Sequence, residues 1–271
     1  MNLFGSLFTS TIGRKFLMAV TGVVLVGFVT GHLVGNLQIF AAPDKINGYA
    51  HFLQSLGPVL WAVRLLMLTC VGIHAWAAIT LWLDSTAARG TEPYAETKWL
   101  QALWASRYMR HTGVVVIAFL LYHLAQFTIG VNRGFFVGQA FKTRIHEYVM
   151  ASDFHLIGFP VVASGQAVHD VYSMVFLGFA NPYVSIFYIV AVGLLAMHLW
   201  HGVDSMFQTF GWRNAKWSVC LRRIAAVFSL LYFLGSLTIP GAILTGAVEP
   251  ASGTYAAQQL AAAPSSLVVH R

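Results

Sequence analysis

Residues 16–40 read FLMAVTGVVLVGFVTGHLVGNLQIF and contain no charged side chain. An α-helix rises 1.5 Å per residue, so about 20 residues cross the hydrocarbon core of a bilayer. The stretch is therefore long enough to span a membrane. It is about twice as long as the apolar core of a signal peptide and includes the polar residues His32, Asn36 and Gln38. We expect it to be kept as a helix.

Four further apolar stretches have the same character. Only 9% of the 271 residues are charged and 58% are hydrophobic, whereas a soluble domain carries about 25% charged residues. Lipid must therefore cover most of the surface. The sequence predicts a single all-α integral membrane domain, residues 1–271, with helices near 16–40, 60–84, 111–131, 184–207 and 223–247 and with Pro182 at the start of the fourth.

The basic residues indicate how the chain crosses the membrane. The net charge is +7, but the Lys and Arg side chains lie in short segments between apolar runs, which suits cytoplasmic loops and argues against nucleic acid as a partner. With the N-terminus inside, ten of the sixteen lie in inner segments. This predicts a multi-pass protein of the bacterial cytoplasmic membrane with a cytoplasmic N-terminus. The long outer segment 131–183 has no clear period, and short interfacial helices are one possibility for it.

Histidines inside the apolar runs are the strongest functional signal. His32, His74, His123 and His198 lie one each in the first four predicted helices, where an ionisable side chain is costly without a partner. Helix rise places His74 and His198 roughly 15 and 14 Å from the inner ends of their helices. His32 is about 12 Å from an outer end, and His123 roughly 18 Å from an inner end. The depths predict an inner pair, His74 with His198, and an outer pair, His32 with His123.

Two facing imidazoles from a four-helix bundle are the ligands of a six-coordinate haem iron. Small residues beside the first two histidines would let a flat macrocycle approach the backbone, although taken by themselves they are better explained by helix packing: Gly31, Gly35, Gly72, Ala75 and Ala78. Zinc is the rival metal. Separate depths and the lack of an accompanying carboxylate or cysteine make a structural zinc site the weaker hypothesis.

Short sequence motifs around these histidines resemble those of the dihaem cytochrome b subunit of succinate:quinone oxidoreductases with a single five-helix anchor. The resemblance covers about residues 12–130 and 167–245, and its most specific motif is the segment from His198 to Gly202. The other matching motifs are Gly31–Asn36, Ala50–Leu56, Ile73–Ala75, Arg110–Gly113, Tyr122–Leu124 and the segment from Ser205 to Gly211.

The resemblance implies a bundle of helices one to four around two haem b groups, with quinone, expected to be menaquinone, as substrate. It also implies a flavoprotein with FAD and an iron–sulfur subunit on the cytoplasmic face, in a complex that could form higher oligomers. Succinate oxidation would take place on the flavoprotein, because this chain has neither a nucleotide-binding glycine motif nor a cysteine cluster. The chain would then be a non-catalytic subunit of a succinate dehydrogenase or fumarate reductase, linking the tricarboxylic acid cycle to electron transport.

Several other residues are weaker candidates. His201 follows His198 by three residues and is a rival haem ligand. Basic side chains at the inner helix ends could meet haem propionates or the iron–sulfur partner, or could simply snorkel: Arg14, Lys15, Arg110 and His111. His51 and His169, in outer segments, could lie near quinone, and a loop-packing role is at least as good for His51.

Two further considerations bear on function. Relatives that reduce fumarate can carry a buried glutamate two residues before the fourth ligand, where this chain has Ala196, so we expect the succinate-oxidising direction. The alternatives are a dihaem anchor for another quinone-linked dehydrogenase and a non-redox transporter whose histidines relay protons.

Overall fold

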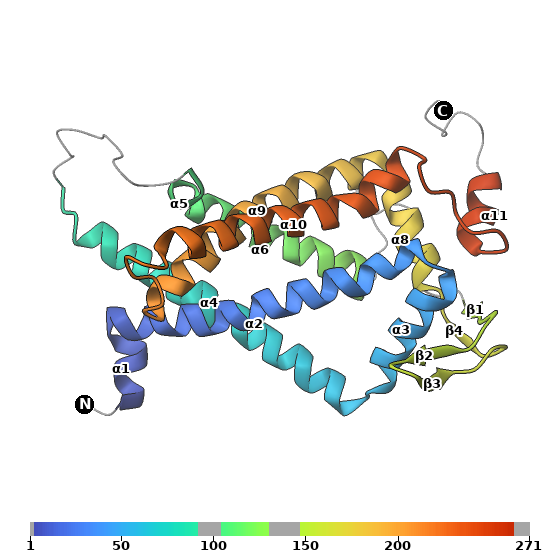
Figure 1. The fold of residues 1–271 in the computed structure, drawn as a ribbon, viewed down its shortest axis with the longest axis horizontal. Coiled ribbons are helices and arrows are strands. Elements are labelled where there is room, and N and C mark those ends of the chain that lie inside the picture. The colour runs from blue at the N-terminus through green and yellow to red at the C-terminus, as the bar shows by residue number, and fades with distance from the viewer. Residues whose placement is uncertain (1–2, 92–103, 130–146, 263–271) are drawn as a thin grey trace. The chain divides into compact units, whose positions relative to one another are not determined.

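A computed structural model describes residues 3–91, 104–129 and 147–262. Within this part of the chain, five helices are long and apolar enough to cross a membrane, as the sequence predicts: Thr11–Phe40, Pro58–Ala87, Met109–Ile129, Pro182–Thr209 and Ser218–Leu244 (Figure 1). The first consists of α2 (Thr11–Asn36) and the short 3-10 helix η1 (Leu37–Phe40). The third consists of α6 (Met109–His123) and the π-helical turn η2 (Leu124–Ile129). The others are α4 (Pro58–Ala87), α9 (Pro182–Thr209) and α10 (Ser218–Leu244).

All five helices begin two to five residues before the predicted positions. The prediction placed each helix end at a charged side chain. Charged side chains limit only the apolar part of a helix that lies in lipid, and the helix itself can continue beyond them. Arg14 and Lys15 lie within α2, and Arg222 and Arg223 within α10, because long basic side chains can extend toward water while the backbone stays helical. Pro182, which the sequence marks as the entry to the fourth helix, is its first residue, two positions before the predicted range. The side chain of Asn181 accepts hydrogen bonds from the Tyr183 and Val184 amides, 3.0 and 3.4 Å away.

The chain forms two compact units, and each long helix contributes residues to both. The first unit is Met1–Gly31, Trp61–Gly113 and Leu195–Leu231. Besides its parts of the long helices it contains α1 (Leu3–Thr9) and α5 (Trp104–Arg107). The second unit is His32–Leu60, Val114–Leu194 and Tyr232–Arg271. It also contains three shorter helices, α3 (Pro43–Ser55), α8 (Val171–Ala180) and α11 (Tyr255–Ala262).

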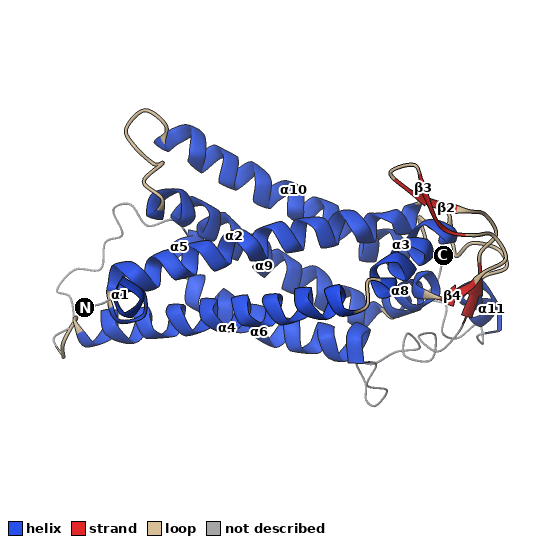
Figure 2. Cartoon of the chain, turned by 90° about the horizontal axis from the view of Figure 1, so that it is seen from below, coloured by secondary structure: helices blue, strands red, loops and turns tan. Residues whose placement is uncertain are grey.

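Part of the segment between the third and fourth long helices folds into strands, which the sequence analysis did not predict. β1 (Glu147–Val149) pairs with β4 (Ala167–His169), and β2 (Phe154–Leu156) pairs with β3 (Phe159–Val162), both antiparallel (Figure 2). Residues 130–146 lie outside the described part. The strands are three or four residues long, which is too short to give a readable alternation of polar and apolar residues.

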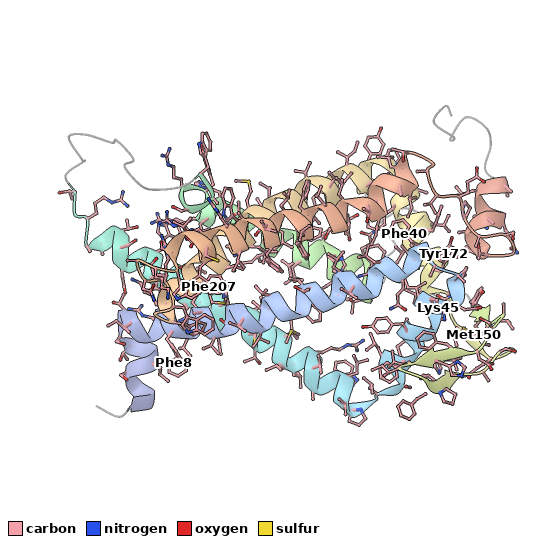
Figure 3. The ribbon with its side chains drawn as sticks, in the orientation of Figure 1. Phe8, Phe40, Lys45, Met150, Tyr172 and Phe207 are labelled. Carbon is pink, nitrogen blue, oxygen red and sulfur yellow. The ribbon has the colours of Figure 1, made fainter. Side chains whose placement is uncertain are left out.

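Helix α8 is the centre of the second unit. Its residues Tyr172 to Phe179 are all buried, although at ten residues the helix is too short to cross a bilayer. Its first turn is held by polar groups from other elements. The Tyr172 amide donates to Asn47 of α3 at 2.8 Å, and the Ser173 hydroxyl accepts from the Ala256 amide of α11 at 3.1 Å. Figure 3 labels Tyr172 on α8 and Lys45 on α3.

Asp44 connects α3 to the strands. Its carboxylate is buried and accepts hydrogen bonds from the Ala151 amide, the Ser152 amide and the Ser152 hydroxyl at 3.0, 3.0 and 2.7 Å. Burial by itself would raise the pKa of Asp44, but hydrogen bonds from Ser152, Ala151 and Tyr148 outweigh it and hold the pKa below its usual value. The ionised carboxylate therefore stabilises the second unit.

We expect Asp44→Asn to lower the free energy of unfolding near neutral pH by about 1.5–3 kcal/mol, the range for hydrogen bonds to a charged group. Because the folded-state pKa is lowered, the wild-type contribution is complete above the unfolded pKa of about 4 and is lost as pH falls through the folded value. Thermal unfolding in detergent between neutral and acid pH measures both effects. Asp153→Asn is the control, since Asp153 is exposed and accepts one hydrogen bond, from the Ser164 amide. Equal losses in the two variants would contradict this role.

A second expectation concerns Gly48, where α3 meets β2. A Cβ atom on Gly48 would lie 2.4 Å from Cγ of Phe154, whose ring is buried. We expect Gly48→Ala to destabilise the protein by about 1–3 kcal/mol through overpacking. Gly5→Ala is the control, because a Cβ there meets no atom within 4 Å. Unfolding temperatures that fall equally in both variants would show that the contact is unimportant.

Candidate functional site

The first unit brings His74 and His198 together. His74 lies on α4 and His198 on α9, and their ring centroids are 6.3 Å apart with an interplanar angle of 58°. Nδ1 of His74 lies 3.1 Å from the Met18 carbonyl oxygen and 3.3 Å from Oγ1 of Thr21, both on α2. A carbonyl oxygen only accepts hydrogen bonds, so Nδ1 of His74 must carry the proton. Its other nitrogen, Nε2, then has a free lone pair.

His198 follows the same pattern on the opposite side of the pair. Its Nδ1 lies 3.4 Å from Oγ1 of Thr112 on α6. The Thr112 hydroxyl donates its own proton to the Met109 carbonyl at 3.0 Å, so toward His198 it acts as an acceptor. Nδ1 of His198 is therefore the donor, and its Nε2 also keeps a lone pair. Both threonines are buried, at 6% exposure for Thr21 and 3% for Thr112.

A repeated dipeptide supports these two rings. Thr21-Gly22 on α2 lies against His74, and Thr112-Gly113 on α6 lies against His198. A Cβ atom on either glycine would lie 3.6 Å from Cε1 of the neighbouring ring. The threonine fixes the imidazole proton and the glycine leaves room for the ring. Sequence analysis missed this support, and the repeat of Thr-Gly in the first and third helices is the signal that could have revealed it.

The second unit brings His32 and His123 together. His32 lies near the end of α2 and His123 is the last residue of α6, and their ring centroids are 5.7 Å apart at an interplanar angle of 88°. Nδ1 of His123 lies 3.2 Å from the hydroxyl oxygen of Tyr188, which donates its proton to Oε1 of Gln126 at 2.8 Å. The Tyr188 oxygen therefore accepts from His123, and Nε2 of His123 is again the free nitrogen.

The π-helical turn after His123 places Gln126 in this network. In η2 each residue advances less far around the helix axis than in an α-helix, and Gln126 is 2% exposed. Its Oε1 meets Tyr188, whereas its Nε2 is buried without a hydrogen-bond partner among the described residues. Tyr188 and Gln126 were not candidates from sequence, because nothing in a single sequence marks a π-helical turn.

The two pairs fit a metal ion held between facing imidazoles. A metal–histidine bond is about 2 Å long, and the ring centre lies about 1 Å beyond the nitrogen, so two coaxial ligands place their centroids about 6 Å apart. The observed values are 6.3 and 5.7 Å. Three of the four rings carry their proton on Nδ1, which is how second-shell partners prepare a histidine for metal binding through Nε2.

Each of the two pairs supplies two imidazole ligands. No group of three or more His, Cys, Asp or Glu side chains that could hold a metal ion occurs within residues 3–91, 104–129 and 147–262. Structural zinc takes four protein ligands and catalytic zinc takes three. Two imidazoles suffice only where a planar macrocycle supplies the remaining four ligands, as in a haem.

Glycines next to the rings differ in what they accommodate. A Cβ atom on Gly31 or Gly72 would meet no atom within 4 Å, so these positions border open space. Gly35 has another role, because a Cβ there would lie 2.7 Å from Cε1 of Tyr49 on α3. Gly35 therefore serves helix packing, one of the two explanations that the sequence left open. Ala75 is half-buried and Ala78 exposed.

The basic candidates of the first unit have protein partners. Arg14 forms an ion pair with Asp84 of α4. The Arg110 guanidinium lies over the Trp82 ring, 5.4 Å from its centroid, and donates to Ser85 at 3.5 Å. Lys15 and His111 are exposed, and the His111 ring lies 6.0 Å from that of Tyr108. Arg14 and Arg110 thus connect α2 and α6 to the last turns of α4.

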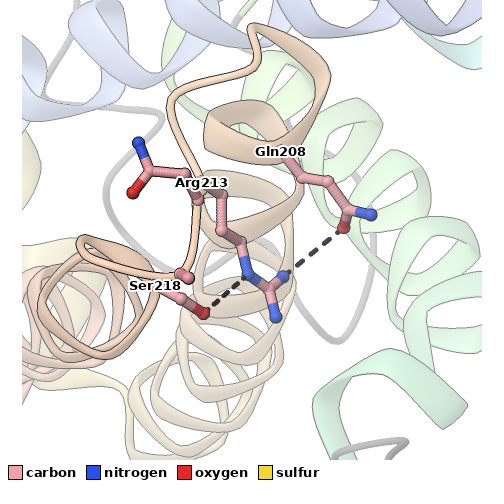
Figure 4. A pocket seen from close by; sticks show the side chains of 5 residues that line it. Gln208, Arg213 and Ser218 are labelled. Atoms are coloured by element: carbon pink, nitrogen blue, oxygen red, sulfur yellow. Dashed lines mark hydrogen bonds between the residues drawn. The ribbon is translucent and has the colours of Figure 1, made fainter.

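His201 is on α9, one turn after His198. The ring contact of His74 is with His198, while His201 is half-buried and influenced by the nearby charge of Asp204. Asp204 accepts a hydrogen bond from Arg213 at 3.1 Å. Arg213 also donates to Gln208 and Ser218, both at 3.4 Å, and these residues line a pocket at the turn between α9 and α10 (Figure 4). Because the arginine donors are used by the turn itself, we assign this pocket a structural role.

The two outer candidates lie at the surface of the second unit. Nε2 of His51 is 3.3 Å from the Gln166 side-chain amide, and His169 stands opposite Glu147 in the β1–β4 pair, where it is exposed. The contacts described above for His123 are with His32 and Tyr188.

Comparison with family models, curated proteins and solved structures finds no match to this chain. The functional argument therefore depends on the two histidine pairs, their hydrogen bonds and the local resemblance in sequence.

Proposed function

We propose that this chain is a membrane-embedded dihaem cytochrome b, the anchor subunit of a succinate:quinone oxidoreductase that carries electrons between an iron–sulfur partner and quinone. The observation that supports the proposal best is the two imidazole pairs, with centroids 6.3 and 5.7 Å apart, in helices that could cross a membrane. Soluble or transport functions give no reason for two pairs of neighbouring imidazoles in which Nδ1 of three rings bonds to an oxygen of another helix.

Some residues would ligate each haem iron, and others would orient those ligands. His74 and His198 would ligate one iron and His32 and His123 the other. Thr21, Thr112 and Tyr188 would orient the rings by accepting Nδ1–H. When bound, a bis-histidine haem supplies reversible one-electron transfer and has no open position for oxygen chemistry.

Two haem sites at different depths suit transfer across the membrane. Thr21, which contacts His74, precedes His32 by eleven residues on α2. At 1.5 Å per residue this separation is about 16 Å of helix, roughly half the hydrocarbon thickness. An electron entering near the cytoplasmic face could thus reach the outer half of the bilayer in two steps.

The partners follow from what the chain lacks and from its resemblance. FAD and iron–sulfur clusters would be on separate flavoprotein and iron–sulfur subunits, and quinone, expected to be menaquinone, would react near the outer pair. Exposed Lys15 and His111 are available for the iron–sulfur partner, since Arg14 and Arg110 already have contacts within the chain.

The membrane potential favours one direction. Moving an electron across the dielectric involves about 2.3 kcal/mol per 100 mV, so a proton would have to accompany it in the opposing direction. Ala196 occupies the position of the buried glutamate in fumarate-reducing relatives. The nearby acid, Asp204, is held by Arg213 and is six residues beyond His198. We therefore propose succinate oxidation as the physiological direction.

The decisive experiment measures haem in the purified complex together with ligand variants. We expect about two haems per chain by pyridine haemochrome and sharp reduced b-type bands, as bis-histidine ligation requires. His74→Ala and His198→Ala should each remove the same haem, and His32→Ala and His123→Ala the other. His201→Ala is the matched control on α9 and should keep both.

The co-purifying proteins separate the rival functions. Flavoprotein and iron–sulfur subunits with succinate dehydrogenase activity support the proposal. A preparation that contains haem but a different dehydrogenase would preserve the dihaem role and refute the partner. An intact preparation without haem would refute the proposal as a whole.

Tyr188→Phe tests the hydrogen bond to one ligand. Donation from Nδ1–H enriches the electron density of the His123 ring and stabilises ferric iron, so its loss should raise the midpoint potential of the outer haem alone. A net hydrogen bond of about 1 kcal/mol corresponds to roughly 40 mV for a one-electron couple. Redox titration followed by optical absorption measures the shift. Tyr232→Phe is the control, since the Tyr232 hydroxyl on α10 bonds to Ser236. Equal shifts of both haems, or none, would contradict the assignment.

A further inference from the structure

The turn between β2 and β3 exposes large apolar side chains. Ile157 is 91% exposed and Phe159 is 73% exposed, although the same hairpin buries Phe154 and Val162 at its other end, at 3% and 2%. The pairing of Leu156 with Phe159 leaves only Ile157 and Gly158 in the turn. Figure 2 shows this turn as a projecting loop. The hairpin is thus anchored at its base and carries apolar groups on a free tip.

Isoleucine is an unusual choice for this backbone. Ile157 has φ +52° and Gly158 has φ +83°. Two-residue turns with positive φ at both positions strongly prefer Asn-Gly or Asp-Gly, and a β-branched residue in this region is a steric outlier. Turn formation alone would be served better by Asn. The strained, exposed Ile157 therefore points to a role for the side chain itself.

The hairpin is confined close to the membrane. It packs on α3, where Phe154 lies against Gly48 and under Lys45, whose ammonium is 5.9 Å from the ring centroid. Helix α3 starts at Pro43, three residues after the span that ends at Phe40, and ends at Ser55, three residues before the span that begins at Pro58. Both ends of α3 are therefore held at the membrane surface, and the hairpin with them.

The composition of the tip fits lipid better than protein. Residues 156–161 read LIGFPV and have no charged or hydrogen-bonding side chain, so they can leave water without burying a charge. A stable protein interface buries roughly 800 Å² on each partner, more than a few tip side chains can offer. Insertion into the boundary between headgroups and acyl chains needs no such area.

We propose that the β2–β3 tip, Ile157 to Pro160, inserts into the interfacial region of the bilayer and fixes the extramembrane part of the second unit against the lipid. The occupant is the lipid of the leaflet that α3 faces. This role is independent of haem binding and depends only on the chain crossing the membrane.

Spin-label accessibility tests the proposal in the full chain. With Cys70→Ala and Cys220→Ser removing the native thiols, a nitroxide is attached at Phe159→Cys or, as a control, at exposed Ser164→Cys after β3. The chain is reconstituted in vesicles of phosphatidylcholine and phosphatidylglycerol. We expect the ratio of collisions with oxygen to collisions with a water-soluble nickel chelate to be several-fold higher at 159 than at 164. Adding Ile157→Asn, which suits the turn, should lower the ratio at 159.

Two results would overturn the proposal. Equal chelate access at 159 and 164 would show that the tip remains in water. A label shielded from both reagents and dipolar-coupled to another label would show contact with a second copy of the chain. Thermal unfolding of Ile157→Asn guards against a folding artefact, because this substitution relieves strain and should not lower stability.

Discussion

An imidazole inside an apolar span must satisfy a donor and an acceptor with little help from water, and this constraint organises the candidate site. In the chain by itself His74, His123 and His198 are half-buried and His32 is exposed. The protein satisfies the donors of His74, His198 and His123 with oxygen atoms from other helices. A donor left unsatisfied in such surroundings would cost several kcal/mol. Once Nδ1 is used, only the lone pair of Nε2 remains, and in the proposed function its partner would be the haem iron. The same bonds that make burial tolerable therefore prepare the rings as ligands.

The first unit provides a hydrogen-bond acceptor for two imidazole N–H groups with the same dipeptide. The Thr-Gly dipeptides at 21–22 and 112–113 each supply a buried hydroxyl oxygen and a position without a side chain beside a histidine from another helix. The second unit uses a longer phenol-to-amide chain, from His123 through Tyr188 to Gln126. Toward the imidazole both groups act as acceptors, and a phenol oxygen is a weaker acceptor than the oxygen of a threonine hydroxyl. This difference gives the two proposed haems different ligand environments, and with them a physical basis for different potentials.

The second unit also shows how a short apolar helix is held outside a span. Helix α8 packs against α3 and α11. Its first turn has polar contacts with Asn47 and Ala256, and near its end the Phe179 carbonyl accepts a hydrogen bond from the Ser185 hydroxyl at 2.6 Å. Asp44 ties the same α3 helix to the strands. The connections between the long helices thus form a small folded layer with its own core, and a hairpin with an apolar tip extends from that layer.

Composition and charge spacing alone predicted a membrane protein with five long apolar helices, which the described residues contain. Placing charge in lipid is costly, so the membrane-crossing segments can be recognised in the sequence as long stretches without charged residues. Histidine depth also predicted which rings the structure would bring together, since helix rise is nearly invariant. Helix starts were misjudged because a helix can continue past a basic residue. The side chain then extends toward water, as at Lys15, or pairs with a neighbouring helix, as Arg14 does with Asp84.

Only the tertiary structure revealed the ring protons, the roles of Tyr188 and Gln126, the packing of Gly35 against Tyr49 and the strands after residue 146. These features depend on contacts between residues far apart in the chain, or on local geometry such as a π-helical turn. Neither has a periodic signature in a single sequence.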